Sequence, residues 1–355
     1  MSRRQNVSGC VPLPEKEDPM KKLFVVAVMA LALTGAVFAG GSRERGAALE
    51  PIPSSECPPE ARGHFDVFFC DKDGDLLADM PEDERFWLDP QTLVFAYTPV
   101  EDPAIYEDMW QPFLDHLAKV TGRNVQFFSV SSYTAQVEAM RAGRLHIAGI
   151  STGPTPFAVN LAGYVPIAIM GGADGQFGYT LQMYVHADSD LHSLEDLKGK
   201  RVAHVTPTSN SGHQAPMALF PRYGLTPGVD YEPVFSGSHE NSALGVVARD
   251  YDAAPVASEV VDRMAERGLF DPADVRIIFE TDPFPTTSYG IAHRLHPDLQ
   301  EKIREAFFSY SFAGTPLGEE FEVDGFIPIV YKDHWDAVRT IQEYNGVQYR
   351  LSDID

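Results

Sequence analysis

Three consecutive short polar side chains, Ser209, Asn210 and Ser211, lie where the sequence predicts that a strand runs into a helix. The segment 200–205 indicates a short strand, and 214–223 indicates the helix. Serine and asparagine cap helix N-termini, where free backbone N–H groups and the positive end of the helix dipole can hold an oxyanion without a formal cation. The segment is therefore either an anion-binding cradle or an ordinary capped helix.

The elements around this segment alternate between strand and helix from Thr92 onward. This rhythm predicts a mostly parallel sheet, with ligand-binding loops at the carboxyl ends of its strands. One such loop is 151–156. Neither a G-x-G-x-x-G nor a Walker motif is present, so a nucleotide is not indicated. The expected strands are 93–97, 124–130 and 145–150, and the expected helices are 108–121, 132–142 and 240–249.

The N-terminal region has the pattern of an export signal. Lys21 and Lys22 precede an apolar run, 23–36, that is too short to span a bilayer comfortably, and an A-x-A-like cleavage pattern ends at Ala39. We therefore expect 20–39 to be a cleaved signal peptide, and we exclude the preceding nineteen residues from the fold. No cysteine follows at the lipobox position, which argues against a lipid anchor. The expected location is periplasmic or otherwise extracytoplasmic.

The net charge limits the partners. The formal charge of the 355 residues is −23, and residues 1–39 carry five basic and three acidic groups, so removing their +2 leaves −25. Such a surface repels nucleic acid and anionic membrane. It also opposes long-range attraction of an anionic ligand, so local dipoles inside a cleft must capture any anion. The composition is that of a soluble globular protein of one or two domains.

Cysteine usage predicts one disulfide. Cys10 precedes the cleavage site, which leaves Cys57 and Cys70 as an even pair in an oxidising compartment. Closing so short a loop stabilises the folded state by about 3 kcal/mol in the chain-entropy model. The bridge would hold together the irregular segment 49–89.

The same segment contains spaced carboxylates around a glycine, a pattern that resembles a calcium loop. It departs from the EF-hand form at its end, where 81–83 crowd together. The alternatives are a calcium site and a polar turn. The carboxylates concerned are Asp71, Asp73, Asp75 and Asp79.

Several motifs in collinear order resemble those of the phosphonate/phosphite substrate-binding proteins of ABC transporters, the PhnD-like family. They are Pro99 with 110–113, Ser132-Tyr133, 194–200, 209–212 with Pro216, and 236–239. The resemblance runs from Leu93 to Ile341 and leaves the N-terminal insert, 49–91, uncovered. It implies an α/β, two-lobed periplasmic binding protein of type II, with mixed sheets flanked by helices, that closes on its ligand like a flytrap.

The resemblance also implies how the chain divides. Lobe one would comprise 92–187 and 285–355, and lobe two would comprise 188–284. The chain would cross between them near 184–188 and again near 282–285. Two crossings permit hinge closure around a cleft.

Five ligand residues would come from lobe two. Ser209, Asn210 and Ser211 occupy the family's Ser-Thr-Ser positions, so their hydroxyl, amide and backbone N–H groups would hold the phosphoryl oxygens. His239 matches a histidine that donates to the same oxygens; taken alone, a histidine in a Ser/Gly turn is more often structural or solvent-facing. Glu259 aligns with a carboxylate that accepts the amino group of 2-aminoethylphosphonate, and its alternative is a carboxylate favoured by a helix dipole.

Lobe one would supply two tyrosines and one residue that differs from the family pattern. Tyr133 and Tyr179 match the family's pocket tyrosines, although a core tyrosine with a satisfied hydroxyl is the commoner case. Thr287 stands where aminophosphonate-binding members carry an aspartate. Because a buried ammonium without full carboxylate pairing is costly, this difference disfavours aminoethylphosphonate and favours phosphite, a small alkylphosphonate or another phosphorus oxyanion.

The expected function is the solute-binding component of an ABC importer, delivering a phosphonate, phosphite or related phosphorus oxyanion to a permease in the inner membrane. The protein would be a monomer that needs no cofactor, and it would not be an enzyme. One alternative is a solute-binding sensor subunit for a receptor. Another is an enzyme acting on a phosphorylated substrate with His239 and Glu259 as acid and base, but no nucleophile and no metal cluster support it.

Overall fold

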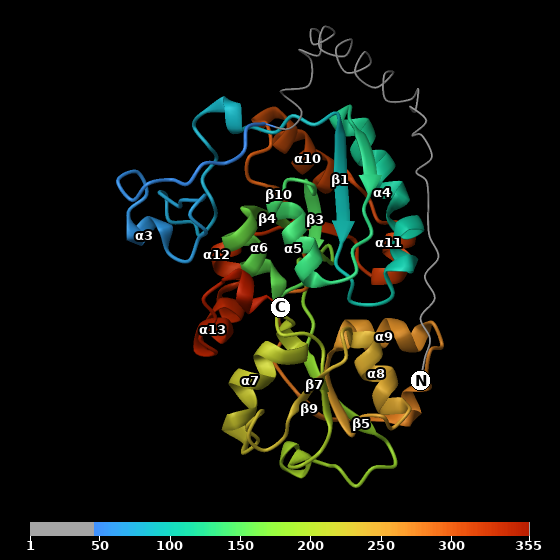
Figure 1. The fold of residues 1–355 in the computed structure, drawn as a ribbon. Coiled ribbons are helices and arrows are strands. Elements are labelled where there is room, and N and C mark those ends of the chain that lie inside the picture. Colours follow the sequence, from blue (N-terminus) through green and yellow to red (C-terminus); the bar gives the residue numbers. More distant parts are fainter. Residues whose placement is uncertain (1–45, 355) are drawn as a thin grey trace, which may run out of the picture. The chain divides into compact units, whose positions relative to one another are not determined.

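The computed structural model describes residues 46–354, so the predicted signal peptide lies outside the described residues. Two β-sheets, each flanked by helices, make up this part of the chain (Figure 1). None of its helices is long and apolar enough to cross a membrane.

The first sheet has six strands in the order β11-β4-β10-β3-β1-β2. Its strands are β1 (Thr92–Tyr97), β2 (Asn124–Phe127), β3 (Ile147–Ile150), β4 (Tyr164–Gly171), β10 (Ser288–Ala292) and β11 (Gly325–Pro328). Pairing is parallel where β1 meets β2 and β3, and antiparallel where β10 meets β3 and β4 and where β11 meets β4. The mostly parallel sheet expected from the alternation is therefore wrong, because β10 returns late in the chain and inserts between β3 and β4.

An aromatic cluster fixes α4 to this sheet. The rings of Phe95 and Trp110 lie 4.7 Å apart between centroids, and Trp110 and Tyr289 lie 5.5 Å apart. All three side chains are buried, so they join β1, α4 and β10 into one core. Figure 1 shows α4 beside β1, and α10 packs against α4. The helices that follow first-sheet strands are α4 (Tyr106–Thr121), α5 (Tyr133–Arg141), α6 (Pro154–Ala162), α10 (Pro297–Ser309), α11 (Pro316–Phe321), α12 (Tyr331–His334) and α13 (Asp336–Tyr344).

The second sheet has five strands in the order β7-β6-β8-β5-β9. Its strands are β5 (Leu181–His186), β6 (Val202–His204), β7 (Pro233–Phe235), β8 (Ala253–Ala257) and β9 (Val275–Glu280). β6 pairs in parallel with β7 and β8, whereas β5 pairs antiparallel with β8 and β9. Its helices are α7 (Ala215–Leu219), α8 (His239–Val247) and α9 (Ser258–Glu266).

The chain passes from the first sheet to the second between Gly171 and Leu181. This crossing precedes the one predicted near 184–188, because β5 is hydrogen-bonded to β8 and β9 and so belongs to the second sheet. The return lies between Glu280 and Ser288. The two crossing segments touch through an antiparallel bridge in which the N–H of Tyr179 donates to the carbonyl of Phe284 over 3.0 Å and the reverse bond spans 2.8 Å.

The N-terminal insert lies against the first lobe. The predicted disulfide between Cys57 and Cys70 is confirmed, with their Cα atoms 5.8 Å apart. The guanidinium of Arg294 donates to the carbonyls of Ala47 and Phe86 at 2.9 and 3.1 Å. The insert, which includes the short helix α3 (Pro59–Arg62), is therefore held both by its own bridge and by a side chain that follows β10.

Candidate functional site

The cradle begins the helical segment that follows β6. Asn210–Gln214 forms a π-helical turn, η5, which runs directly into α7, so the helix starts four residues earlier than the predicted 214. π-Helical turns are frequent at functional sites. The hydroxyl oxygen of Ser209 accepts the N–H of Gly212 at 3.2 Å, which makes Ser209 the N-cap. Its own hydroxyl hydrogen remains available, so capping and anion binding are compatible.

The cradle side chains are buried and poor in partners. Asn210 and Ser211 are at most 1% exposed. The side-chain oxygens of Asn210 and Ser211 have no hydrogen-bond partner within the described residues, and the same holds for the hydroxyl of Tyr133. A buried polar atom without a partner costs about 1–3 kcal/mol. Two of these atoms belong to neighbouring residues of the cradle, so the cradle presents polar atoms that the described residues do not pair.

His239 is the first residue of α8 and is 3% exposed. Its Nδ1 accepts the backbone N–H of Ala257 at 3.2 Å, so the ring proton sits on Nε2. Nε2 lies 3.4 Å from the hydroxyl of Ser209, and it therefore points its N–H toward the cradle. Burial, with the charge of Arg263, lowers the pKa of His239 to about 3. The imidazole is a neutral donor at physiological pH.

The two tyrosines reach the cradle from outside the second lobe. Tyr133 is the first residue of α5, and Tyr179 lies on the first crossing segment. The amide nitrogen of Asn210 donates to the hydroxyl oxygen of Tyr179 at 3.2 Å. Burial raises the pKa of both phenols, so they stay protonated and can donate. The structure thus brings Tyr179 into direct contact with the cradle.

Glu259 and Thr287 lie on the other side of the site. The hydroxyl of Thr286 donates to both carboxylate oxygens of Glu259, at 3.1 and 2.9 Å. Burial raises the pKa of Glu259, and the nearby guanidinium of Arg263 opposes this effect. Thr287 is 6% exposed and faces the hydroxyl of Tyr97. Glu259 thus has a hydroxyl donor and a cation within the protein itself.

Glycine at position 153 lets the two lobes meet. A Cβ atom there would lie 2.0 Å from the carbonyl oxygen of Thr208 and 2.5 Å from the backbone nitrogen of Asn210. Only glycine allows this approach of the 151–155 loop to the cradle. The sequence showed this loop as a possible source of donors, but it did not show that backbone contact is its role.

The C-terminal helices hold both sides of this contact, which could not be predicted from the sequence. The indole of Trp335 donates to the carbonyl of Thr152 at 3.0 Å, and the amide of Gln342 donates to that of Gly153 at 2.8 Å. Asn345, at the end of α13, donates to the backbone carbonyl of Gln214 at 2.8 Å. Such amide contacts carry no sequence motif.

A cavity of about 720 Å³ adjoins the ligand residues and is lined from both lobes, with Tyr179 and Glu259 in its wall. Its charged wall is mainly acidic, and Arg263 also lines it. The carboxylates are those of Asp174, Glu259, Asp262, Glu266, Glu280, Glu320 and Glu322. Such a wall repels anions at long range, and Ser209, Asn210, Ser211 and His239 are not among its lining residues.

Buried ion pairs cross between the lobes beside this cavity. Glu101 follows β1, and its carboxylate lies 2.6 Å from the guanidinium of Arg267 and 3.4 Å from that of Arg263. The side chain of Glu101 is 1% exposed. Glu101 and Glu259 raise the pKa of Arg263 despite the opposing effect of burial. The sequence did not point to Glu101, because its partners lie more than 160 residues away.

The acidic loop of the insert brings three of its four predicted carboxylates together. Oxygens of Asp71, Asp73 and Asp79 lie within 4.8 Å of one another, and Asp75 is outside the group. The carboxylate of Asp71 accepts the backbone N–H groups of Gly74 and two following residues at 2.7–3.2 Å. These bonds are those of a polar turn. Calcium binding therefore stays a prediction.

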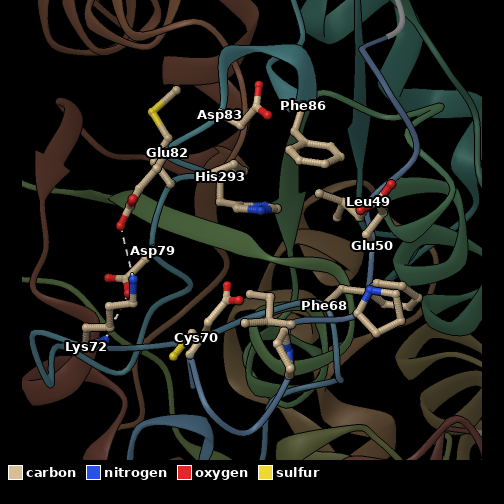
Figure 2. A pocket seen from close by; sticks show the side chains of 16 residues that line it. Leu49, Glu50, Phe68, Cys70, Lys72, Asp79, Glu82, Asp83, Phe86 and His293 are labelled. Carbon is tan, nitrogen blue, oxygen red and sulfur yellow. Dashed lines mark hydrogen bonds and ion pairs between the residues drawn. The ribbon is translucent and has the colours of Figure 1, made fainter. Parts of the chain in front are cut away.

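A second cavity, of about 600 Å³, lies where this insert meets the first lobe. Figure 2 shows His293 among its lining side chains, with Phe68, Phe86 and the acidic Glu82 and Asp83 around it. None of the predicted ligand residues lines this cavity, so it is separate from the cradle.

The two sheets, the double crossing and a polar site with residues from both lobes define a two-lobed solute-binding protein. The family model of ABC transporter, phosphonate, periplasmic substrate-binding proteins matches residues 95–335, and the chain belongs to that family. It is therefore a substrate-binding component of a transporter, and its family is extracytoplasmic. The match begins after the insert.

Known relatives agree with this assignment. The chain is 28% identical to the phosphate-import protein PhnD of Mycolicibacterium smegmatis, over 73% of this chain and 85% of the relative. It is 25% identical to the phosphonates-binding periplasmic protein of Escherichia coli, over 62% and 66% of the two chains. The fold resembles PhnD1 of Prochlorococcus marinus, solved with methylphosphonate, with a TM-score of 0.66 at 16% identity over 73% of this chain and all of that one.

Proposed function

We propose that this protein binds a small phosphorus oxyanion, such as a phosphonate, phosphite or phosphate, at the cradle formed by Ser209, Asn210 and Ser211. One observation carries the proposal. Buried polar atoms without hydrogen-bond partners among the described residues lie in the region toward which the Nε2–H of His239 points. Neutral donors suit an oxyanion, because a hydrogen bond is stronger when its acceptor is charged. Relatives named for phosphate import and for phosphonate binding support the choice of phosphorus.

The ligand would then pass to an ABC permease in the inner membrane. Support comes from the family to which the chain belongs. We propose that lobe one comprises the first sheet with its helices and lobe two the second, with crossings at 172–180 and 281–287 in place of the boundaries inferred from sequence. Cleavage after Ala39 remains part of this proposal, and mass spectrometry of the exported protein would test it.

A ligand panel tests the function. Thermal melting with phosphite, methylphosphonate, aminoethylphosphonate, phosphate and sulfate should raise the melting temperature for phosphorus oxyanions, because a ligand that binds only the native state stabilises it. Calorimetry should then give one site per chain. The Ser211→Ala variant should bind the best ligand about 10- to 150-fold more weakly, since a hydrogen bond to a charged group is worth roughly 1.5–3 kcal/mol. Binding of none of the phosphorus compounds would overturn the proposal.

Calcium at Asp71, Asp73 and Asp79 is a separate proposal, supported by the approach of their oxygens. Titration of calcium into chelator-treated protein should show a site that Asp73→Ala removes. A titration without heat or stabilisation would leave a polar turn held by the disulfide.

A further inference from the structure

The side-chain amide of Asn210 is held in a defined orientation. Its nitrogen donates to the hydroxyl oxygen of Tyr179 at 3.2 Å, while its Oδ1 is buried and has no donor within the described residues. An amide oxygen can only accept a hydrogen bond. A ligand that completes the site must therefore bring a hydrogen to this atom, or leave a buried acceptor unpaired.

The polarity of the neighbouring groups is complementary. The hydroxyl of Tyr179 already accepts from Asn210, so its own hydrogen is free to donate. His239 presents Nε2–H because its Nδ1 accepts from Ala257. The hydroxyls of Ser211 and Tyr133 have no hydrogen-bond partner in the part of the chain that the structure describes, and they can donate as well. A bound oxyanion would thus meet donors for several oxygens and an acceptor at Asn210.

We propose that Asn210 is a specificity-determining residue that selects phosphorus oxyanions carrying a P–O–H group. This inference rests on the proposed function. The monoanion of a phosphonate, phosphite or phosphate can donate its O–H to Oδ1 while its other oxygens accept from the surrounding donors. Sulfate and sulfonates have no O–H at neutral pH, and neither has the phosphonate dianion. Each would place an oxygen lone pair against Oδ1.

The other titratable groups near the cradle do not account for such a pH dependence, with one exception. The tyrosines have raised pKa values and His239 has a lowered one, so they keep their charge between pH 5 and 8. Arg263 stays charged. Glu259 has a raised pKa and needs a control. The titratable and charged groups around the cradle are His213 from the π-helical turn itself, His204 from β6, Tyr97 from β1, Tyr133 from α5, Tyr179 from the first crossing, His239 from α8, and Glu259 and Arg263 from α9. Burial lowers the pKa of His204 and His213, so both stay neutral over the same pH range.

The experiment is calorimetry with methylphosphonate and methanesulfonate at several pH values, on wild type and Asn210→Thr. Threonine is the residue at this position in the family pattern, and its hydroxyl can donate or accept. Wild-type affinity for methylphosphonate should fall about tenfold per pH unit above the ligand's second ionisation, because one proton is required. Methanesulfonate should bind at least about 100-fold more weakly, since a site built around a ligand O–H rejects the analogue that lacks it.

Asn210→Thr should flatten the pH profile and reduce the discrimination at least tenfold, while Glu259→Gln should keep the wild-type slope. The proposal is overturned if Asn210→Thr retains the slope, if Glu259→Gln abolishes it, or if wild-type affinity rises with pH, which would mean that the amide offers its nitrogen to the ligand. Failure of every phosphorus oxyanion to bind at any pH would instead overturn the proposed function, and this inference with it.

Discussion

At the residue scale, the proposed binding site gathers buried polar atoms that have no hydrogen-bond partner within the described residues. Tyr133 provides the sharpest test, because its buried hydroxyl has no hydrogen-bond partner among residues 46–354. Tyr133→Phe should weaken binding of the best ligand by about 10- to 150-fold, through loss of a bond worth roughly 1.5–3 kcal/mol to a charged group. The unliganded protein should be as stable as wild type or slightly more stable, since the variant removes an unsatisfied polar atom. Calorimetry and thermal melting measure the two quantities.

Tyr164 offers a matched control. It too is fully buried, but its hydroxyl donates to the carbonyls of Ala148 and Ser288 within the first sheet, at 3.0 Å in each case. Tyr164→Phe should lower the stability and leave ligand affinity nearly unchanged. If Tyr133→Phe behaved like Tyr164→Phe, the hydroxyl of Tyr133 would be a structural group and not a ligand donor.

Thr287 tests the choice between ammonium-bearing and simple oxyanions. Its side chain is buried close to Tyr97, on the side of the site where Glu259 lies. Thr287→Asp should shift preference toward aminoethylphosphonate and away from methylphosphonate, because a second carboxylate would pair with the ammonium and repel an anion without one. Competition calorimetry with both ligands gives the ratio of affinities. An unchanged ratio would place Thr287 outside the pocket.

At the element scale, α9 carries charged residues into the interface between the lobes. Arg263 and Arg267 are four residues apart on one helix face, and both meet the buried carboxylate of Glu101. Glu101→Met should lower the free energy of unfolding by about 3–5 kcal/mol, because it removes the carboxylate that pairs with the buried guanidinium of Arg263 and with Arg267. Denaturant unfolding measures this loss.

The control for this variant is an exposed ion pair of the second lobe. Arg249 and Asp188 lie 2.8 Å apart with both side chains more than half exposed, and Arg249→Met should change stability by at most about 1 kcal/mol. Equal effects of the two substitutions would mean that the interlobe pair contributes no more than a surface contact.

The elements also show what sequence patterns could and could not provide. Helical and strand periodicity located α4, β1 and α8 to within a few residues, because these elements bury one regular apolar face. The antiparallel pairing of β10 could not be inferred, since pairing partners lie far apart in the chain. The cradle could be predicted because Ser209–Ser211 is a local pattern, and its role in binding stays a prediction. Glu101, Gly153 and Trp335 were missed because each acts through one long-range contact.

At the scale of the whole molecule, buried histidines make stability depend on pH. Burial lowers the pKa of His146 and His213 to about 4 and that of His239 and His293 to about 3. These residues are neutral when folded, and in the unfolded chain they take up protons below about pH 6.5. Their contribution is complete above pH 6.5 and is lost as the pH falls, at about 1.4 kcal/mol per pH unit for each histidine.

His146→Gln should make the free energy of unfolding depend less steeply on pH between pH 6.5 and 4.5, by the equivalent of about one proton taken up on unfolding. Denaturant unfolding at a series of pH values measures this dependence. The raised pKa of Glu259 acts in the opposite direction, so the proton count is taken from the difference between variant and wild type. Identical slopes would show that His146 is protonated in the folded protein.

Closure of the two lobes is the motion that transport requires, because a ligand can shift a conformational equilibrium only through differential affinity for its states. Direct contacts join the lobes in the structure. Gly153 lies against Thr208, and Glu101 forms an ion pair with Arg267. The side chain of Asn345 donates a hydrogen bond to the backbone carbonyl of Gln214. A ligand held by Tyr133 and by the cradle would add bonds that exist only in the closed form. Small-angle scattering should therefore give a smaller radius of gyration with saturating ligand, and Tyr133→Ala should weaken both affinity and compaction. A scattering curve that does not change while calorimetry reports full binding would show that ligand is held without lobe closure.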